Sequence, residues 1–356
     1  MKSRPEVLIV INPGSTSTKF ALWSREGCIS EHVVRHDADK LNPRAVEQFA
    51  YRRELIDATL EPLLAEVQIV GVVGRGGLLK PIEGGTYRVN QAMLDYLQLP
   101  TTSNHASNLG AMLAAHYARR FEVEAFVVDP VTVDEFNDVA RLSGVLWCER
   151  ESRSHALNIK YSVQRAAAEL GKAVSETRFV VAHLGGGTSI AAVKDGRIID
   201  ANNALHGMGP YSPERAGALP IGALIERCFT EGVTKKALLT ELARGSGLMA
   251  YCGTSDVREV LKRIEAGDKQ AEQALHGMIY QDAKEIGAMA AVLEGWIDAV
   301  IVTGGLAHSN EVISILRPYI EYLGEIIIYP GEGELEALSA GAFRVIDRVE
   351  TAKEYE

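Results

Sequence analysis

Cysteine is scarce in this chain, with four among 356 residues. The four lie far apart and form neither a CxxC pair nor the Cys/His spacing of a metal site: Cys28, Cys148, Cys228 and Cys252. A chain of this length can bury a sizeable core without disulfides. The pattern therefore predicts reduced thiols in a cytoplasmic protein and argues against a disulfide-stabilised secreted scaffold.

Long hydrophobic runs and excess positive charge are also missing. The first apolar run covers residues 7–11, which is too short for a membrane span or the core of a signal peptide, and no later run approaches the length that a membrane span requires. The formal net charge is −10. Nucleic-acid and anionic-membrane surfaces need clustered Lys and Arg, so we expect neither partner. An anionic substrate would have to be held by a few local cations.

An internal repeat organises what is present. The strand–turn–strand pattern VLIVI, NPGSTS, TKFALW (residues 7–23) recurs near mid-chain as FVVAH, LGGGTS, IAAVKDGRIID (residues 179–200). The repeat predicts a duplication, although two unrelated hairpins could produce the same pattern. The length suits two α/β domains, which we place at residues 1–165 and 166–356, with the final helix able to pack back on the first domain.

Hydrophobic periodicity gives the expected elements. Apolar residues at three- and four-residue spacing predict helices at residues 44–66, 105–121, 155–170, 271–293 and 334–348. Short apolar runs between them predict strands at residues 69–73, 125–128, 299–303 and 326–329, and a turn at Glu26-Gly27 predicts a further strand at residues 28–34.

The two glycine- and hydroxyl-rich turns could hold a polyphosphate. Glycines at 14 and 185–187 let backbone N–H groups approach phosphate oxygens, and Ser15 and Thr16 add hydroxyl donors. NPGSTSTK is not a Walker A loop, because it lacks the GxxxxGK[ST] spacing and leads into a strand. Each turn could equally be a simple hairpin. A third glycine pair, Gly304 and Gly305, follows the strand near residue 300 and favours the phosphate interpretation.

Two arginines stand in glycine-flanked loops. Arg75 lies in GVVGRGG and Arg215 in GPYSPERAG. A guanidinium with small neighbours can bind a carboxylate or a phosphoryl group through two parallel hydrogen bonds. The alternative is that either one is an ordinary surface arginine.

Acidic residues follow two of the predicted strands. Asp129 comes directly after AFVV, where open α/β sheets often place reactive groups, and a carboxylate there would suit Mg²⁺. Asp129 could instead cap a turn. Glu332 and Glu334 follow the strand at residues 326–329 and could also serve a metal, or Glu334 could be an acid favoured at a helix N-terminus.

Three of the nine histidines have informative settings: His105 in TTSNHASNLG, His155 in RESRSHALN, and His183 directly before the glycine turn. Each could donate to a phosphate or carboxylate oxygen. A buried structural histidine is the alternative for all three.

Taken together, these motifs resemble the acetate/butyrate kinase family. The resemblance rests on VLIVINPGSTSTKFALW and HLGGGTSIAAVKDGRIIDANNALHGMGPYSPERAGALP, and it spans essentially the entire chain. GRGGLLKPIEGGTYRVN, HASNLGAMLA, DPVTVDEFNDVARLSG and SHALNIK resemble the butyrate-phosphorylating branch. The family has an actin-like, sugar-kinase-like, ribonuclease H-like fold, which implies two duplicated α/β domains around a nucleotide cleft.

The resemblance also implies roles on the substrate and phosphoryl side. Asn12 would contact the transferring phosphate, with Lys19 in the same signature. Arg75 and Arg215 would hold the acyl carboxylate and the phosphoryl group. The remaining expected residues of this side are His155, stabilising the phosphoryl in flight, the catalytic Asp129, His105 near the substrate, and His183 at the nucleotide.

Further roles concern the nucleotide and metal. Gly185, Gly186 and Gly187 would form the second phosphate loop. Asp256 and Arg258 would lie near the adenine and ribose, and Gly304 and Gly305 on the adenosine side. The metal-linked glutamate could be Glu332 or Glu334, and we favour Glu334. This chain has Ile159 where many relatives have a second histidine, so that position is not expected to be essential.

The implied activity is Mg²⁺- and ATP-dependent phosphorylation of a short-chain carboxylic acid by a homo-oligomer. The acceptor could be butyrate, isobutyrate, propionate or valerate, because two buried methylenes are worth only about 1.6 kcal/mol. A sugar kinase would normally need a carboxylate base facing a hydroxyl, whereas this chain supplies arginines. A chaperone-type ATPase would need an appended partner-binding domain, and a catalytically silent nucleotide-binding scaffold is the remaining alternative.

Overall fold

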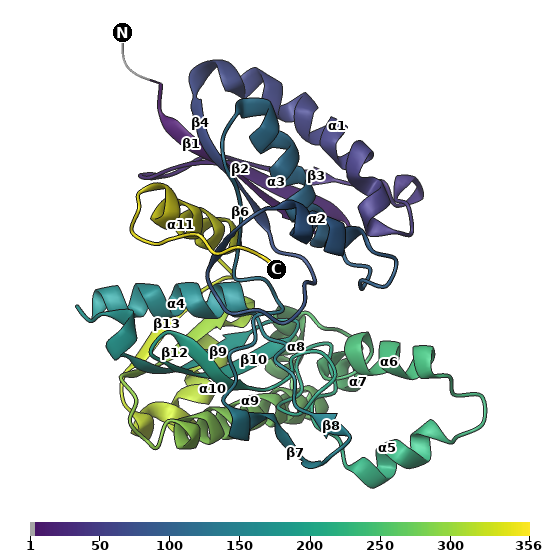
Figure 1. Ribbon diagram of the computed structural model, residues 1–356. Coiled ribbons are helices and arrows are strands. Elements are labelled where there is room, and N and C mark those ends of the chain that lie inside the picture. Colours follow the sequence, from purple (N-terminus) through teal and green to yellow (C-terminus); the bar gives the residue numbers. More distant parts are fainter. Residues whose placement is uncertain (1–3) are drawn as a thin grey trace. The chain divides into compact units, whose positions relative to one another are not determined.

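The computed structural model describes residues 4–356, and the chain forms two compact units (Figure 1). Unit 1 combines the residues up to Val133 with Gly333–Glu356. Unit 2 is continuous and covers Asp134–Glu332. Each unit is built around its own β-sheet.

The sheet of unit 1 has the order β3-β2-β1-β4-β6-β5. β1, β2 and β3 form an antiparallel meander, whereas β4 and β6 run parallel to β1. The strands are β1 (Glu6–Pro13), β2 (Ser17–Ser24), β3 (Gly27–Arg35), β4 (Gln68–Arg75), β5 (Thr86–Arg88) and β6 (Ala125–Val128).

Helices cover both faces of this sheet. Because strand side chains alternate, Val7, Ile9 and Ile11 of β1 face a core shared with α1 (Phe49–Leu60) and α3 (Asn108–Phe121). The opposite face contacts α11 (Glu334–Ile346), which packs on β1, β4 and β6. Figure 1 shows α1 and α3, with α2 (Gln91–Gln98), on one side of the strands and α11 on the other.

The sheet of unit 2 repeats the same plan. Its order is β11-β10-β9-β12-β13, with an antiparallel β9-β10-β11 meander and with β12 and β13 parallel to β9. This matches β3-β2-β1-β4-β6 strand for strand and confirms the duplication predicted from the two hairpins. The strands are β9 (Arg178–Leu184), β10 (Thr188–Lys194), β11 (Arg197–Ala201), β12 (Ala299–Gly304) and β13 (Ile326–Pro330).

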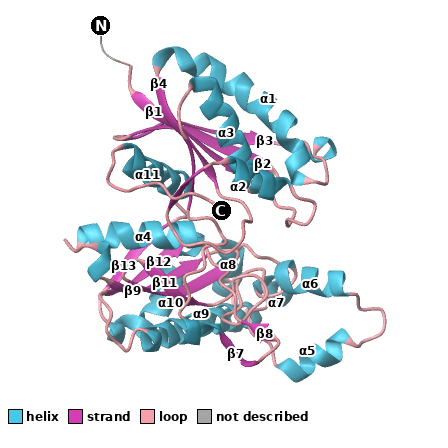
Figure 2. Cartoon of the chain, in the orientation of Figure 1, coloured by secondary structure: helices cyan, strands magenta, loops and turns pink. Residues whose placement is uncertain are grey.

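Unit 2 carries more helices than unit 1. α4 (Ala156–Glu169) packs on β9 and β12, and Figure 2 shows it across the strands from α9 (Lys269–Val292) and α10 (Asn310–Ile320). The other elements are α5 (Ile221–Cys228), α6 (Lys235–Arg244), α7 (Leu248–Cys252), α8 (Val257–Glu265) and the small hairpin of β7 (Leu142–Val145) and β8 (Cys148–Glu149). Among residues 4–356, no helix combines the length and hydropathy that crossing a bilayer requires.

The division between the units differs from the boundary expected at residues 165 and 166. Unit 1 ends at Val133, so α4 belongs to unit 2. It resumes at Gly333, so α11 belongs to unit 1, an arrangement already allowed for the final helix. The physical reason is packing: the apolar face of α4 lies on β9 and β12, and that of α11 lies on β1, β4 and β6. Periodicity identifies a buried helix face, but it does not identify the sheet that covers it.

Two glycines allow β4 and α3 to touch at the backbone. A Cβ added to Gly74 would lie 2.1 Å from the carbonyl oxygen of Gly110, and one added to Gly110 would lie 2.1 Å from that of Arg75. Neither clash can be relieved by a side-chain rotation, because both partners are backbone atoms. This close approach fixes the end of β4, where Arg75 lies.

We therefore expect Gly110→Ala to destabilise the protein by about 2 kcal/mol or more, the scale of an overpacked core. Gly222→Ala is the matched control, because an added Cβ at this position in α5 meets no described atom within 4 Å. Thermal unfolding of both variants measures the difference. Equal melting temperatures for Gly110→Ala and Gly222→Ala would contradict the proposed backbone contact.

Candidate active site

Three polar side chains meet at one edge of the unit 1 sheet. β1 and β4 are parallel and in register up to Ile11 and Gly74, so the next residues, Asn12 and Arg75, lie side by side. Glu334, the first residue of α11, joins them. Asn12 Nδ2 donates to Glu334 Oε2 at 2.5 Å, Arg75 Nη1 forms an ion pair with Glu334 Oε1, and Arg75 Nη1 lies 3.4 Å from Asn12 Oδ1.

This cluster leaves part of the Arg75 guanidinium available. The Arg75 side chain is 27% exposed, and only Nη1 forms contacts within the described residues. Its Nε and Nη2 hydrogens form a second fork suited to a carboxylate or phosphoryl oxygen pair. The ion pair with Glu334 holds the Arg75 side chain in this position. The Glu334 carboxylate is also the kind of hard oxygen ligand that Mg²⁺ prefers.

The first hairpin borders the same edge. Its turn is closed by the Gly14 N–H, which donates to Ser17 O at 2.7 Å, and Ser15 and Thr16 are exposed at the tip. Lys19 pairs with Asn12 across β1 and β2. Directly paired residues in an antiparallel ladder point to the same face, so Lys19, also exposed, shares the face of Asn12.

Asp129 holds a loop beside this edge. It is 4% exposed and has a positive φ of 38°. Its Oδ1 accepts the Gly85 N–H at 2.6 Å, and its own N–H donates to Gly85 O at 3.1 Å. A non-glycine residue in the left-handed region marks a constrained position, and here the constraint is this reciprocal pair of hydrogen bonds.

His105 precedes α3 in unit 1, where the charge of Arg75 acts on it. Its Nδ1 accepts the backbone N–H of Ser107 at 3.2 Å and lies 2.7 Å from Ser107 Oγ. With Nδ1 an acceptor, the neutral ring carries its proton on Nε2, where it can donate. Desolvation by the surrounding protein, together with the positive charge of Arg75, lowers the pKa of His105, so the ring is neutral at pH 7.

A second cluster lies at the corresponding edge of the unit 2 sheet. His183 at the end of β9 is paired in register with Thr303 of β12. Asn158 of α4 connects them, because its Oδ1 lies 2.8 Å from His183 Nδ1 and its Nδ2 lies 3.2 Å from Thr303 Oγ1. The ring of His155 stacks on that of His183, with centroids 4.0 Å apart.

Ser189 of β10 orients His155. Its Oγ accepts the His155 backbone N–H at 3.2 Å and lies 2.8 Å from His155 Nδ1. If the hydroxyl donates to Nδ1, the imidazole proton resides on Nε2, the nitrogen that could donate to a substrate oxygen. Sequence patterns did not single out Asn158, Ser189 or Thr303, since a lone amide or hydroxyl in a helix or strand carries no distinctive local signal.

Arg215 is held against the second glycine turn. Its Nη1 donates to Ala204 O, and a Cβ added to Gly187 would lie 2.0 Å from that same Nη1. Its Nε is buried and has no hydrogen-bond partner among the described residues. Burial lowers the pKa of Arg215; the charge of Glu214 raises it, and that of Arg244 lowers it further. A buried N–H without a partner costs about 1 to 3 kcal/mol, which an incoming anion could recover.

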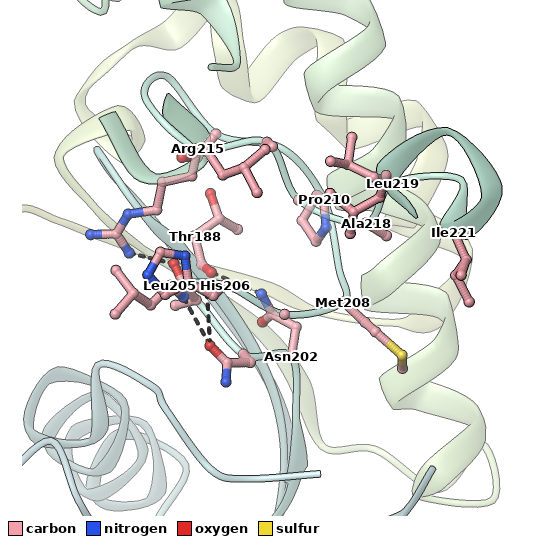
Figure 3. A pocket seen from close by; sticks show the side chains of 18 residues that line it. Thr188, Asn202, Leu205, His206, Met208, Pro210, Arg215, Ala218, Leu219 and Ile221 are labelled. Carbon is pink, nitrogen blue, oxygen red and sulfur yellow. Dashed lines mark hydrogen bonds between the residues drawn. The ribbon is translucent and has the colours of Figure 1, made fainter. Parts of the chain in front are cut away.

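A cavity of about 330 Å³ opens beside Arg215 (Figure 3). Figure 3 shows Arg215, Leu205 and His206 toward one side of it and Leu219, Ile221 and Met208 toward the other. The volume is at the lower end of the range for small-molecule pockets. A cation beside an otherwise largely apolar cavity suits a ligand with one anionic end and a short apolar chain.

The remaining predicted residues fall into three places in unit 2. Gly185 and Gly186 form the turn beside Gly187, and Ser212 Oγ donates to Gly186 O at 2.6 Å. Gly304 ends β12 with a φ of 89°. Its N–H donates to Gly331 O at 3.0 Å, and its carbonyl oxygen accepts the Gly331 N–H at 2.9 Å. Gly305 begins a 3₁₀ turn. The last place is the N-terminus of α8, occupied by Asp256 and Arg258.

Asp256 and Arg258 pair with each other at the surface. Asp256 caps α8 by accepting the Arg258 N–H at 2.9 Å, and its Oδ2 lies 2.7 Å from Arg258 Nη2. The hydrogen bonds from the Arg258 side chain and backbone lower the pKa of Asp256 to about 2. The Arg258 side chain is 87% exposed. The pair is therefore a surface pair, unlike the more buried histidine cluster.

The structure thus brings several of the predicted residues together within each unit, but not all of them. Asn12, Arg75 and Glu334 are in direct contact in unit 1. His155 and His183 are in contact in unit 2, as are Gly187 and Arg215. Glu332 is placed differently from Glu334: its carbonyl oxygen accepts Asn158 Nδ2 at 2.8 Å in unit 2.

Comparison with known proteins relates the chain to phosphotransferases. Residues 149–327 match the Acetokinase family. A probable butyrate kinase from Enterococcus faecalis (strain ATCC 700802 / V583) is 45% identical over 352 residues, 98% of this chain and 98% of that protein.

Two solved structures show the similarity in fold. The acetate kinase of Porphyromonas gingivalis gives a TM-score of 0.76 at 18% identity and covers 95% of this chain and 99% of its own. A putative N-acetylmannosamine kinase from Listeria monocytogenes gives a TM-score of 0.51 at 13% identity and covers 97% of this chain and 100% of its own. The predicted α/β fold class, with two related actin-like and sugar-kinase-like units, is confirmed.

The contact between Gly187 and Arg215 generates a prediction. We expect Gly187→Ala to displace the Arg215 guanidinium from Ala204 O, because the added Cβ would lie 2.0 Å from Nη1. A crystal structure of the variant would show the displacement. Gly186→Ala is the matched control, since its nearest contact, the carboxyl group of Glu214, lies at an ordinary 3.9 Å. An unmoved guanidinium in Gly187→Ala would refute the steric argument.

Proposed function

Because the chain belongs to the acetokinase family, we propose that it transfers the γ-phosphoryl group of ATP to butyrate. A bond forms between a carboxylate oxygen and the γ-phosphorus, the bond from that phosphorus to the bridging oxygen of ADP breaks, and the products are butanoyl phosphate and ADP. The family establishes a phosphotransferase that acts on a carboxylate. The choice of butyrate follows the name of the Enterococcus relative.

One observation carries the proposal: an arginine beside each glycine turn keeps unused donors. Arg75 has Nε and Nη2 free of contacts within the described residues, and Arg215 has a buried Nε without a partner there. Two anionic reactants repel each other, so a carboxylate and a triphosphate need fixed cations between them. Phosphoryl transfer depends mainly on such positioning and charge neutralisation.

No general base is needed for this reaction. A carboxylic acid with a pKa near that of Glu, about 4.3, is already ionised at neutral pH. The neutral His105 and the Nε2 side of His155 would act as hydrogen-bond donors to substrate and phosphoryl oxygens. A kinase acting on a hydroxyl would place a carboxylate near its acceptor, whereas Glu334 is occupied by Arg75 and Asn12.

The glycine turns would hold the phosphates. Backbone N–H groups of the first hairpin, with Ser15, Thr16 and Lys19, would contact them from unit 1, and Asn12 would contact the transferring group. In unit 2, Gly185–Gly187 and His183 would also contact the phosphates. Gly304 and Gly305 would border the adenosine, and the exposed pair of Asp256 and Arg258 would lie near the ribose.

The residues present also suit Mg²⁺. The Glu334 side chain is 17% exposed and ends in a hard carboxylate. Within the described residues, no group of three His, Cys, Asp or Glu side chains converges, so nucleotide oxygens and water would supply most ligands, as Mg²⁺ tolerates. Bound there, the ion would neutralise phosphate charge. Asp129 is the weaker ligand candidate, because it is 4% exposed and is therefore less accessible to an ion than Glu334.

The cavity beside Arg215 is our candidate for the acyl chain. With the carboxylate at Arg215, the chain would extend toward Leu219, Ile221 and Met208, which line the cavity. A volume of about 330 Å³ could hold about eleven waters at about 30 Å³ each, more than the six heavy atoms of butyrate require. The cavity therefore sets no upper limit at four carbons.

The first test is incubation with ATP, Mg²⁺, hydroxylamine and straight-chain acids of two to six carbons. We expect hydroxamate from butyrate at a higher rate than from acetate, by about tenfold for two more buried methylenes. Valerate should also react, because the cavity has room for it. Absence of hydroxamate from every acid would refute the proposed activity.

The second test removes the arginines. We expect Arg75→Ala and Arg215→Ala each to lower kcat by about 10²-fold, the scale of losing one preorganised donor. Arg88→Ala and Arg227→Ala are matched controls in units 1 and 2, since both are about half exposed and form surface ion pairs with Glu124 and Glu241. A folded Arg75→Ala or Arg215→Ala enzyme with nearly full turnover would remove that arginine from the mechanism.

A further inference from the structure

Arg52 of α1 is a buried cation directly behind the first hairpin. It is 1% exposed and is the largest fully buried side chain among the described residues. Within residues 4–356, none of its hydrogen bonds goes to a carboxylate. An arginine this deeply buried normally has an acidic partner, so its isolation requires an explanation.

Four of the six hydrogen bonds of the Arg52 guanidinium go to the hairpin. Nη1 donates to Gly14 O at 2.8 Å, to Thr18 Oγ1 at 3.0 Å and, more weakly, to Ser17 O at 3.4 Å. Nη2 lies 3.4 Å from Ser15 O. The remaining acceptor is the side chain of Gln48, one turn earlier in the chain, which orients Arg52 by accepting from Nε and Nη2 at 3.0 and 2.7 Å.

These bonds determine which way the hairpin amides point. No peptide bond in the described chain is cis. In a trans peptide the C=O and the following N–H point in opposite directions. When Arg52 binds the carbonyls of Gly14 and Ser15, the N–H groups of Ser15 and Thr16 therefore point away from it. Consecutive N–H groups aimed the same way can donate to the same anion.

The positive charge is uncompensated and persists at neutral pH. Burial lowers the pKa of Arg52 to about 10, which still leaves the group protonated at pH 7. His36 lies across Thr18, with Nε2 2.9 Å from Thr18 Oγ1. Burial and the nearby Arg52 lower the pKa of His36 to about 4, so His36 is neutral and adds no charge. An anion on the outer side of the hairpin would therefore meet a single fixed positive charge behind it.

We propose that Arg52 is a positioning residue for nucleotide phosphate: it holds the hairpin carbonyls so that the Ser15 and Thr16 amides face the anion, and its charge is balanced only when phosphate binds. The proposal rests on the proposed function in one respect, namely that the first hairpin contacts the phosphates of ATP. By thermodynamic linkage, the phosphate should stabilise a protein with Arg52 more than one without it.

The experiment compares Arg52→Met, Arg52→Lys and Arg53→Met with the wild type. Arg53 is the matched control, because it neighbours Arg52 in α1 but is 33% exposed and pairs with Glu54 and Asp57. MgATP affinity is measured by calorimetry, and KM is measured for ATP and for butyrate. We expect Arg52→Met to weaken MgATP binding about tenfold or more, on the scale of lost charged hydrogen bonds, with KM for butyrate nearly unchanged.

Arg52→Lys keeps the charge but reaches fewer carbonyls, so we expect an intermediate loss of MgATP affinity, and Arg53→Met should bind as the wild type does. If Arg52→Met melts at a lower temperature yet binds MgATP normally, the residue serves stability alone and the proposal is overturned. If Arg52→Met does not fold, Arg52→Lys decides: wild-type MgATP affinity in that variant overturns the proposal too.

Hydrogen exchange on the nucleotide-free proteins separates this inference from the proposed function. We expect residues 12–19 to exchange faster in Arg52→Lys than in the wild type or Arg53→Met, whatever the enzyme phosphorylates. Unchanged exchange there would refute the positioning role. The opposite outcome is also informative. If the wild type neither binds MgATP nor forms hydroxamate, the proposed function is refuted. Faster exchange in Arg52→Lys would then still support the role of Arg52 in holding the hairpin.

Discussion

The parallel pairing of a central strand with its neighbour organises both candidate clusters. β1 runs beside β4, and β9 runs beside β12, so each pair ends at one edge of its sheet. This places Asn12 next to Arg75 in unit 1 and His183 next to Thr303 in unit 2. The polar groups are held by backbone ladders rather than by mobile loops, which gives them the precision that charge neutralisation in phosphoryl transfer requires.

Local sequence signals were sufficient for the parts of the molecule that depend on neighbours in the chain. The apolar runs VLIVI and FVVAH and the glycine-containing turns after them predicted both hairpins, and the repeated sheet order confirmed the duplication. Arg75 and Arg215 were found through their flanking glycines, and the structure supplies the reason. Gly110 accommodates the backbone of Arg75, and Gly187 accommodates the side chain of Arg215.

Features that depend on distant partners had no such signal. Glu334 meets Asn12 across 322 positions, so no local pattern excluded Glu332, and only the family resemblance favoured Glu334. Arg52 lies in an unremarkable helical stretch, and nothing local shows that its side chain turns toward a hairpin more than 30 residues earlier. The boundary expected near residue 165 also differs from the structure, because helical periodicity does not reveal that α4 covers the sheet of unit 2.

The return of α11 to unit 1 has a consequence for biosynthesis. One face of the first sheet packs against α11, a helix that leaves the ribosome about 320 residues after β1. Unit 2 is a single uninterrupted segment and contains everything it needs for its own core. Although N-terminal domains usually mature first during translation, here the second unit can complete its core while the first still exposes apolar strands. Chaperone protection during synthesis would therefore be needed most by the half of the protein that is made earliest.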